Sequence, residues 1–563
     1  MKIIKYICVA SLLFSSCQDL DLNPLSEATN ENWFNDEKEI TMSVNAMYSL
    51  GFWEGVEDNW TDNEASRTSG TSFVFGTLTG QDGKVSNMWK NSYTAIARAN
   101  TVIQKIENLQ EGILSEEKKN QFLGELLCTR ASMYARLTFH FGDVPLVVEP
   151  IDIDAAFQMG RTPKAEVMKQ IYEDFDRAIS YLNVKKGSVV RITKGAALAL
   201  KARTALFNHD YQLAADAAKQ CIELDYYRLY PDFEKLFYPA TKNSEESIFA
   251  IPRSLSDGVS IYRFHTLERM PRNFGGWASY TPTWDLLASY ECIDGLPIDE
   301  SPLFDPHDPF KNRDPRCGMT IVPFNSVFLG VTYAPHPDSL KVRNYNTGEL
   351  IDNQDNKSYT QHASYTGLLW KKGFDETCKL NGSRIDPEMT VVRYADVLLM
   401  YAEAMIELNK IDQSVLDAIN QVRARAYKVE VSDISSYPAV TTTSQSELRT
   451  IVRTERRMEF AREDSRYYDL IRWGIADKSL TMKNYGILYP VDELYDRVVN
   501  KGLWFWAKAP KIDENGSADF TELEQMGLVN VLSQRSFNKR QYLWPIPTKD
   551  ILINENMTQN PGY

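Results

Sequence analysis

The alternation of apolar and polar residues is most regular in Val391–Trp473. Apolar side chains recur there at intervals of three and four residues, which places them on one face of an α-helix. A polar break at Asn409–Asp412 divides the pattern into two helices, and so short a link joins antiparallel neighbours. We therefore predict a helical hairpin. Its apolar faces consist of Val397, Tyr401, Ala404, Met405 and Leu408 on the first helix and Val415, Ala418, Ile419, Val422 and Ala426 on the second.

The end of the same stretch carries many more charges. Glu455–Glu463 and Tyr467–Trp473 still contain apolar residues, such as Phe460 and Leu470, that a helix has to bury. Glu455, Glu459 and Glu463 lie four residues apart, as do Arg462 and Arg466, so interleaved ion pairs on or between helices are expected. We interpret these charges as a structural ion-pair network rather than as a ligand site.

The hairpin pattern occurs again in Thr193–Leu224, where small residues at the helix crossing and a tyrosine at the turn resemble a tetratricopeptide unit. Taken together, the periodic segments predict a mainly α fold on a scaffold of tetratricopeptide-like helical hairpins. Further helices are predicted at Asn35–Leu50, Val85–Leu109, Glu116–Phe141 and Thr162–Leu182.

Irregular segments interrupt this helical pattern. Gly51–Gly83 is rich in glycine, and Pro252–Pro387 contains twelve prolines and several aromatic clusters. In the second segment we predict a large loop-rich, partly β insertion, with short β pairs near Met319–Phe324 and Thr390–Arg393. The predicted organisation is an N-terminal helical part (35–251), the loop-rich insertion (252–387) as the ligand-binding part, a C-terminal helical part (388–480) and an irregular, extended segment (481–563) packed on the body.

The N-terminus has the pattern of a lipoprotein signal peptide. Lys2 and Lys5 precede a short apolar run that ends in small residues before Cys17. The run is too short to span a bilayer, and it resembles a bacterial lipobox, although Phe14 is bulky for its position. We predict a signal peptide at 1–16, lipidation of Cys17 and a lipidated tether at 17–34; an ordinary secretory signal is the alternative.

Composition and charge exclude several function classes. With 43% hydrophobic and 25% charged residues, the chain is typical of a folded globular protein. Its net charge of −14 disfavours nucleic-acid binding. Neither the cysteines nor the six histidines have metal-ligand spacing, and the common catalytic and nucleotide-binding motifs are absent. We expect no metal, no cofactor and no catalytic residues.

Two kinds of candidate residue remain in the irregular segments. Asp294, Asp299 and Asp314 could serve a glycoside hydrolase that uses two carboxylates, although each fits a turn or helix cap better. Exposed tryptophan and tyrosine rings suit the apolar faces of sugars, and neighbouring polar side chains suit their hydroxyl groups. The candidate glycan-binding residues are Trp277, Tyr280, Trp284, Arg272 and Asn273 in the insertion and Trp60, Asp62 and Asn63 in the glycine-rich segment.

Motifs along nearly the whole chain resemble the SusD/RagB-like outer-membrane lipoproteins. The matching stretches are Cys17 with Leu20–Pro24, Arg98–Ile103, Arg130-Ala131, Phe141–Leu146, Thr193–Ala197, Asp294-Gly295, Asp314–Arg316, Arg393–Ala404, Glu455–Arg457, Arg466–Trp473, Pro545–Pro547 and Gln559–Tyr563. Their order and number make the resemblance specific, although each motif alone is weak.

The resemblance implies a helical body of tetratricopeptide-like units with a loop-rich face that binds glycan. It also implies a lipid-anchored position on the outer face of the outer membrane, where the protein delivers oligosaccharide to a TonB-dependent SusC-like transporter without catalysis. Ligand residues in this family vary with the glycan, so none is carried over by motif. The alternatives are a surface glycoside hydrolase and a peptide-uptake or adaptor lipoprotein of the same family.

Overall fold

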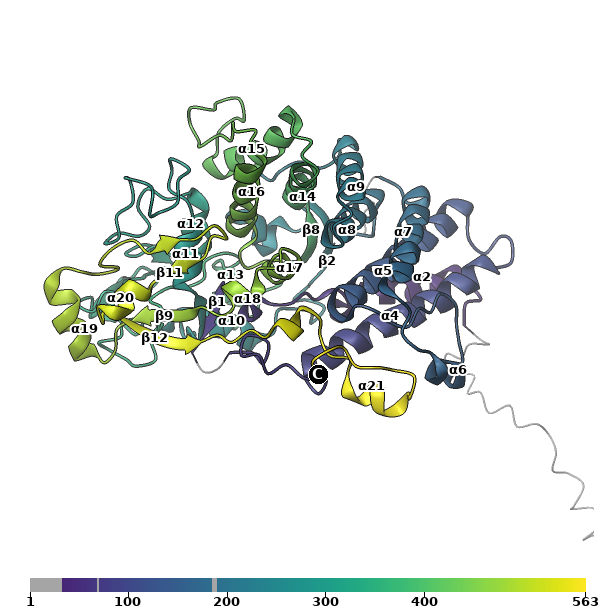
Figure 1. The fold of residues 1–563 in the computed structure, drawn as a ribbon, viewed down its shortest axis with the longest axis horizontal. Coiled ribbons are helices and arrows are strands. Elements are labelled where there is room, and N and C mark those ends of the chain that lie inside the picture. Colours follow the sequence, from purple (N-terminus) through teal and green to yellow (C-terminus); the bar gives the residue numbers. More distant parts are fainter. Residues whose placement is uncertain (1–32, 68–69, 185–189) are drawn as a thin grey trace, which may run out of the picture.

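The computed structural model describes residues 33–67, 70–184 and 190–563. Helices make up one half of the molecule and loops with short strands the other half, so the mainly α fold is confirmed (Figure 1). The predicted signal peptide, Cys17 and all but the last two residues of the tether lie outside the described residues.

The N-terminal helices pack side by side in chain order, and the predicted hairpin at 193–224 is present as α8 and α9. Thr193 caps α8 by accepting a hydrogen bond from the backbone of Ala196 at 3.3 Å, which fixes where that helix begins. The helices are α2 (Glu37–Asn45), α3 (Leu50–Trp53), α4 (Gly83–Glu107), α5 (Glu116–Phe141), α6 (Ile153–Gln158), α7 (Lys164–Tyr181), α8 (Lys194–Phe207) and α9 (Tyr211–Glu223).

The second predicted hairpin is also present, and it continues the same array. Helix α14 packs against α9, so the two hairpins are neighbours although the insertion separates them in sequence. Asp412 caps α15 through the backbone of Ser414 at 2.9 Å. The C-terminal helices are α14 (Tyr394–Glu407), α15 (Gln413–Tyr427), α16 (Gln445–Phe460), α17 (Arg466–Arg472) and α18 (Ala476–Ser479).

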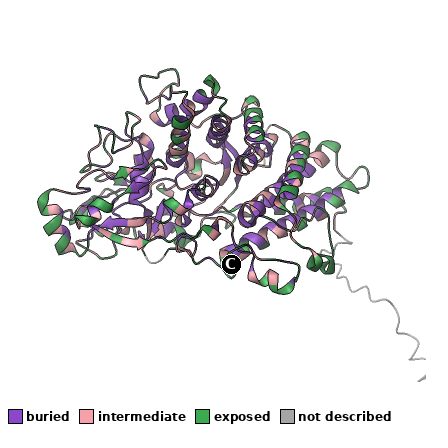
Figure 2. Ribbon diagram, viewed as in Figure 1, coloured by how far each residue is buried: buried purple, intermediate pink, exposed green. Residues whose placement is uncertain are grey.

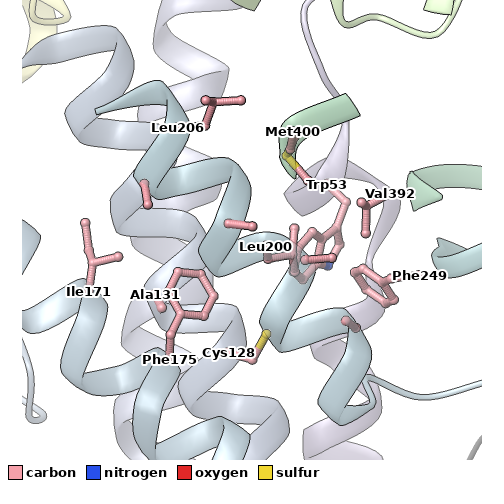
Figure 3. Packing of buried hydrophobic residues seen from close by; sticks show 14 of the residues in the cluster. Trp53, Cys128, Ala131, Ile171, Phe175, Leu200, Leu206, Phe249, Val392 and Met400 are labelled. Atoms are coloured by element: carbon pink, nitrogen blue, oxygen red, sulfur yellow. The ribbon is translucent and has the colours of Figure 1, made fainter. Parts of the chain in front are cut away.

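One large apolar core runs through the helical half (Figures 2 and 3). Phe175 on α7 and Leu200 on α8 pack in it, and strands β2 and β8 contribute Phe249 and Val392. Cys128 and Cys221 are buried free thiols in this core. This continuous core makes the helices a rigid support for the loops beside them.

The loop-rich half has its own core, centred on Trp284, Trp370 and Trp506. All strand pairs are antiparallel; β4 to β7 form one four-stranded sheet, and the others are two-stranded. The strands are β1 (Glu64–Ser66), β2 (Ser247–Ile251), β3 (Tyr280–Pro282), β4 (Val327–Phe328), β5 (Val331–Thr332), β6 (Lys341–Asn344), β7 (Glu349–Asp352), β8 (Met389–Arg393), β9 (Lys483–Ile487), β10 (Lys511–Ile512), β11 (Ala518–Asp519) and β12 (Val529–Gln534). The short helices are α10 (Arg263–Arg269), α11 (Trp284–Ser289), α12 (Pro315–Thr320), α13 (Thr377–Leu380), α19 (Val491–Arg497), α20 (Thr521–Gln525) and α21 (Thr548–Ile553).

Three local predictions need correction. The first helix is broken into α2, a 3₁₀ turn and α3. The strand predicted at 319–324 is the end of α12 followed by a single bridge between Ile321 and Trp370, whereas the strand at 390–393 is confirmed as β8. The segment 481–563 is only partly extended, because β9 pairs with β12 and three short helices form.

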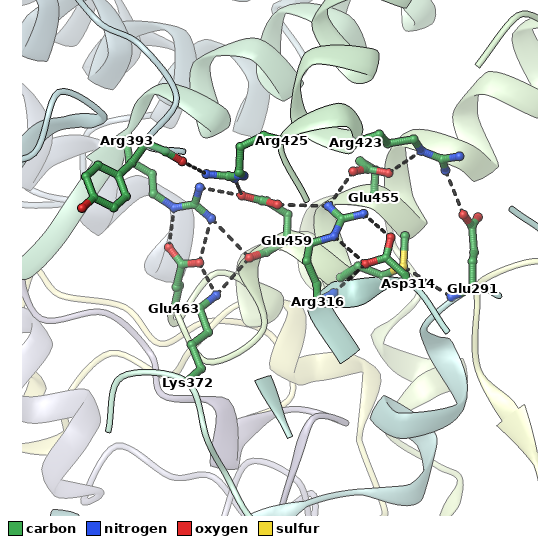
Figure 4. A network of polar contacts seen from close by, with 12 residues as sticks. Glu291, Asp314, Arg316, Lys372, Arg393, Arg423, Arg425, Glu455, Glu459 and Glu463 are labelled. Carbon is green, nitrogen blue, oxygen red and sulfur yellow. Dashed lines mark hydrogen bonds and ion pairs between the residues drawn. The ribbon is translucent and has the colours of Figure 1, made fainter. Parts of the chain in front are cut away.

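A buried ion-pair network joins the two halves, and Glu459 on α16 lies at its centre (Figure 4). Its carboxylate accepts hydrogen bonds from Arg316 at 3.0 Å and Arg393 at 2.7 Å, and it also pairs with Arg425. Arg316 belongs to the insertion, where it forms a bidentate pair with Asp314 at 2.9 and 2.8 Å. The predicted structural role of the α16 charges is thereby confirmed.

Arginine side chains keep Glu459 and a second buried carboxylate, Asp396, ionised. Burial alone would raise the pKa of Glu459, but Arg425, Arg393 and Arg316 hold it well below its ordinary value. Burial acts in the same direction on Asp396, yet Arg203 and Arg456 lower its pKa to about 2. Both carboxylates therefore remain ionised at neutral pH. Glu459 fastens the loop-rich half to the helices, and Asp396 joins α14 to α8 and α16.

Candidate functional site

Helix α10 and the turn after it bring three aromatic side chains together on the surface. Tyr262 is 61% exposed, Phe264 42% and Trp277 36%. The rings of Phe264 and Trp277 are stacked, with centroids 5.4 Å apart and planes inclined by 28°. Tyr262 meets Phe264 edge-on at 5.1 Å. We call these three residues the aromatic platform.

The backbone around Trp277 fixes the position of this platform. Its N–H donates to the carbonyl of Leu267 on α10 at 2.7 Å. The preceding turn depends on two glycines, because Gly275 has a φ of +84° and a Cβ on Gly276 would lie 2.3 Å from the carbonyl oxygen of Met270. The tryptophan ring is therefore held against α10 by backbone contacts.

Polar side chains adjoin the platform. Arg67 donates to the carbonyl oxygens of Trp277 at 3.0 Å and His362 at 2.5 Å, which ties two loops together. The Lys357 ammonium lies 3.4 Å from the ring centroid of Tyr365. Burial, with a smaller contribution from the Arg67 charge, lowers the pKa of Lys357 to about 7. We call Arg67, Lys357, His362 and Tyr365 the polar rim.

Three of the residues predicted from the sequence lie beside the platform. Tyr280 on β3 is half-buried, with the Arg269 guanidinium 5.0 Å from its ring centroid. Arg272 and Asn273 begin the turn that leads to Trp277, and their backbone N–H groups donate to Asp355 at 2.7 and 3.1 Å. Both groups of the Asn273 side-chain amide are already hydrogen-bonded within the insertion, so its role is to hold the turn.

The other four predicted residues are buried, which corrects the expectation that they form a surface for sugar. Trp60 packs between Phe73 and Trp544, each with its ring centroid 5.3 Å away. Trp284 lies in the core of the loop-rich half and donates to the carbonyl of Thr366 at 2.7 Å. Asp62 and Asn63 are buried and bound to arginine side chains. Asp62 accepts from Arg466 at 2.8 and 2.6 Å, and Asn63 accepts from Arg457 at 3.2 Å.

Family comparisons agree with this architecture. Residues 245–563 match the model of the SusD family, and residues 19–206 match a model described as starch-binding and associating with the outer membrane. The chain belongs to the SusD family. No helix in the described residues combines the length and the apolar character needed to cross a membrane.

Known SusD-like proteins align with most of the length of this SusD-family chain. A SusD-like protein of Formosa agariphila is 24% identical over 84% of this chain and 90% of its own length. The solved structure of a SusD-like carbohydrate binding protein from Bacteroides fragilis has 29% identity and a TM-score of 0.76, covering 93% of this chain and 99% of its own. A second SusD-like structure from the same species, at 23% identity, has the same fold with a TM-score of 0.73 over 96% of this chain and all of its own.

Sequence reasoning missed Tyr262 and Phe264. Their signal was present as the short run Tyr262-Arg263-Phe264-His265, in which aromatic and polar residues alternate inside the loop-rich insertion. A six- or seven-residue helix shows little periodicity, so this run did not stand out from the surrounding loops.

The loop carboxylates considered for hydrolysis have structural partners. Asp314 caps α12 and pairs with Arg316. Asp294 accepts from the Ser301 hydroxyl at 2.7 Å, and Asp299 accepts from the backbone of Ile512 at 3.0 Å. These contacts confirm Asp314 as a cap residue and Asp294, which also accepts from the backbone of Leu296, as a turn residue, whereas Asp299 joins its loop to β10. Among the described residues, no group of three or more His, Cys, Asp or Glu side chains is placed to hold a metal ion.

Proposed function

We propose that the aromatic platform and the polar rim bind an oligosaccharide. The observation that carries this proposal is the stacked, exposed pair of Phe264 and Trp277. Sugar rings present C–H faces that pack on such planes, while their hydroxyl groups need donors and acceptors nearby. Arg67, which contacts the Trp277 carbonyl, supplies donors beside the stacked rings, and Tyr280 adds a half-buried hydroxyl.

Family membership supports the same proposal. The Bacteroides fragilis neighbour is named a carbohydrate binding protein, and the family model at the N-terminal part is described as starch-binding. A binding role without catalysis also agrees with the structural partners of Asp294, Asp299 and Asp314. The protein then captures a glycan and leaves its cleavage to other proteins.

The test is binding of the purified protein to soluble starch and to an array of plant, algal and host glycans, followed by calorimetry with the glycan retained. Trp277→Ala and Phe264→Ala are expected to weaken affinity about tenfold or more each, equivalent to about 1.4 kcal/mol. Tyr345→Ala is the matched control, because Tyr345 is an aromatic residue that is 59% exposed and lies away from the platform, in the turn between β6 and β7. Unchanged affinity in both platform variants would exclude this site, and release of sugar products would favour the hydrolase alternative.

We further propose that the protein is anchored by lipid on Cys17, faces the cell exterior and delivers its glycan to a TonB-dependent SusC-like transporter. The lipobox-like sequence and the description of the N-terminal family model support this arrangement. Co-purification with the co-expressed transporter is expected, and Cys17→Ala should move the protein out of the membrane fraction. Binding to the transporter with no retention on any glycan would instead favour the adaptor alternative.

A further inference from the structure

Helix α10 also forms one wall of a cavity of about 350 Å³. The residues of α10 that line the cavity are His265, Thr266 and Arg269, whereas the platform uses Tyr262 and Phe264. The opposite walls come from the loop after α3 and from the chain after α16. This cavity is therefore next to the platform but is built from different side chains.

Three buried polar atoms in the cavity lining lack hydrogen-bond partners among the described residues: Arg253 Nε, a donor, and the two acceptors Asp58 Oδ1 and Thr266 Oγ1. Asp58 is 4% exposed; its Oδ2 accepts from the backbone N–H of Arg462 at 2.6 Å, but its Oδ1 has no hydrogen-bond partner among the described residues. Thr266 is 1% exposed, and its hydroxyl is likewise unpartnered in the described part of the chain. Buried groups of this kind are uncommon, because each loses its hydration without compensation.

The cavity lining is acidic. It contains seven carboxylates and four lysine or arginine side chains. Arg269 already forms a bidentate pair with Glu64 at 2.8 and 2.7 Å. Glu57 and Asp464 form no salt bridge with any described residue, and neither do Lys84, Arg253 and Arg462 in the same lining. Because carboxylates outnumber lysine and arginine side chains in the lining, its balance of charge is negative.

We propose that this cavity binds a small molecule through a primary ammonium group, with Asp58 as its counter-ion and the Thr266 hydroxyl as a second ligand. An ammonium group donates three hydrogen bonds and accepts none, which suits the free Oδ1 of Asp58 and the lone pairs of Thr266. The aromatic side chains of Phe237 and Phe374 in the lining suit the attached carbon skeleton. This ligand site is separate from the proposed glycan site.

Binding of a cation at this place is coupled to proton release. Burial, and then the charges of Asp464 and Glu64, raise the pKa of Asp58 to about 8, so this carboxyl is mostly protonated at pH 7. An ammonium ligand favours the ionised form, and a proton leaves as it binds. The charged groups that face Asp58 from the elements around it are Glu57, Asp62, Glu64, Lys84, Arg269, Arg462 and Asp464.

The experiment is calorimetry on the full-length protein with putrescine and glucosamine, two sources of the same ammonium chemistry, and with glucose as the matched neutral sugar. At least one amine is expected to bind, with no binding of glucose. Putrescine affinity should rise as pH goes from 6 to 8, and the heat should depend on the ionisation enthalpy of the buffer. Failure of both amines to bind, or equal binding of glucose, would overturn the proposal.

Variants separate this site from the platform. Asp58→Asn should weaken amine binding at least about tenfold and remove its pH dependence. Asp216→Asn on the exposed face of α9 makes the same chemical change and should alter neither. If Asp58→Asn does not fold, Thr266→Val tests the proposal in its place, because this variant is also expected to lose affinity for the amine. Full amine affinity in a folded Asp58→Asn protein would refute the assignment, and Trp277→Ala should retain amine binding even if the glycan proposal fails.

Discussion

The ion-pair network around Glu459 and the aromatic platform around Trp277 follow opposite physical rules. The network is buried, charged and connected, and it joins segments far apart in the sequence. The platform is exposed, apolar and held by the backbone of one helix and one turn. The first kind of site fixes a fold, and the second leaves ring faces free for a ligand.

Several of the stretches that resemble the SusD/RagB-like family contribute to the network, and none of them contributes to the platform. Asp314, Arg316, Arg393 and Glu455 contribute buried charges to it. Arg456 and Arg457 form separate buried ion pairs, with Asp469 and Asp285. Removing one member leaves its partners charged and buried, so each position is strongly constrained. A ring on the platform can change without this penalty, and the family resemblance therefore identifies the scaffold better than the ligand.

The largest expected effect is on the network. Glu459→Gln keeps the shape of the side chain but leaves the Arg316, Arg393 and Arg425 guanidinium groups without their shared counter-ion. We expect a loss of about 3–5 kcal/mol in the free energy of unfolding, measured by denaturant titration. Glu300→Gln, on an exposed loop, is the control and should leave stability unchanged. An unaltered unfolding midpoint in Glu459→Gln would show that the network is not structural.

The next effect is a dependence of stability on acid. The folded pKa of Asp396 is about 2, below the usual value of 3.8, so its contribution is complete above about pH 4 and is lost as pH falls toward 2. This loss corresponds to about 2 kcal/mol of unfolding free energy. Asp396→Asn should be less stable than the wild-type protein at pH 7, and its free energy of unfolding should fall less between pH 7 and pH 2. The measurement is denaturant unfolding of both proteins over this pH range. If their free energies of unfolding fall in parallel, the Asp396 ion pairs do not cause the acid dependence.

A backbone change should separate the platform from the network. Gly276→Ala places a Cβ against the Met270 carbonyl, so the turn that carries Trp277 has to move. We expect glycan affinity to fall about tenfold, with a stability loss of about 1–3 kcal/mol. Gly83→Ala is the control, because nothing lies within 4 Å of its added Cβ. Wild-type affinity in Gly276→Ala would mean that the position of Trp277 does not matter.

The smallest effect is expected at the edge of the platform. Tyr280→Phe removes only a hydroxyl and keeps the ring under Arg269. Affinity should fall about threefold or less, equivalent to about 0.6 kcal/mol, and calorimetry would measure it. A loss as large as that of Trp277→Ala would place Tyr280 at the centre of the site instead.

The helices were predictable because their signal is local. Glu116–Phe141 matches α5 at both ends, since a helical apolar stripe and a glycine at the end are visible in the sequence itself. The short strands of the loop-rich half were not, because β1 pairs with β3 across more than two hundred residues. Such pairing depends on tertiary contacts rather than on local propensity.

The candidate site was only partly predictable for a related reason. An aromatic residue in an irregular segment is exposed or buried according to what distant chain covers it. Trp60 is covered by Trp544 from the C-terminal segment, and Trp284 by Phe505 and Trp506. Trp277 has no such cover and stacks on Phe264 instead. Composition pointed to the right segment, but only the fold distinguished these three tryptophans.

One paired measurement tests the division between scaffold and platform most directly. Trp277→Ala and Glu459→Gln are compared in denaturant unfolding and in calorimetry with the retained glycan, under conditions where both are folded. We predict that Trp277→Ala loses glycan affinity at least about tenfold, with a change in unfolding free energy below about 1 kcal/mol. Glu459→Gln should instead lose about 3–5 kcal/mol of unfolding free energy and keep its glycan affinity. If Trp277→Ala binds normally, or if Glu459→Gln loses affinity while folded, the glycan is bound by the network region and not by the platform.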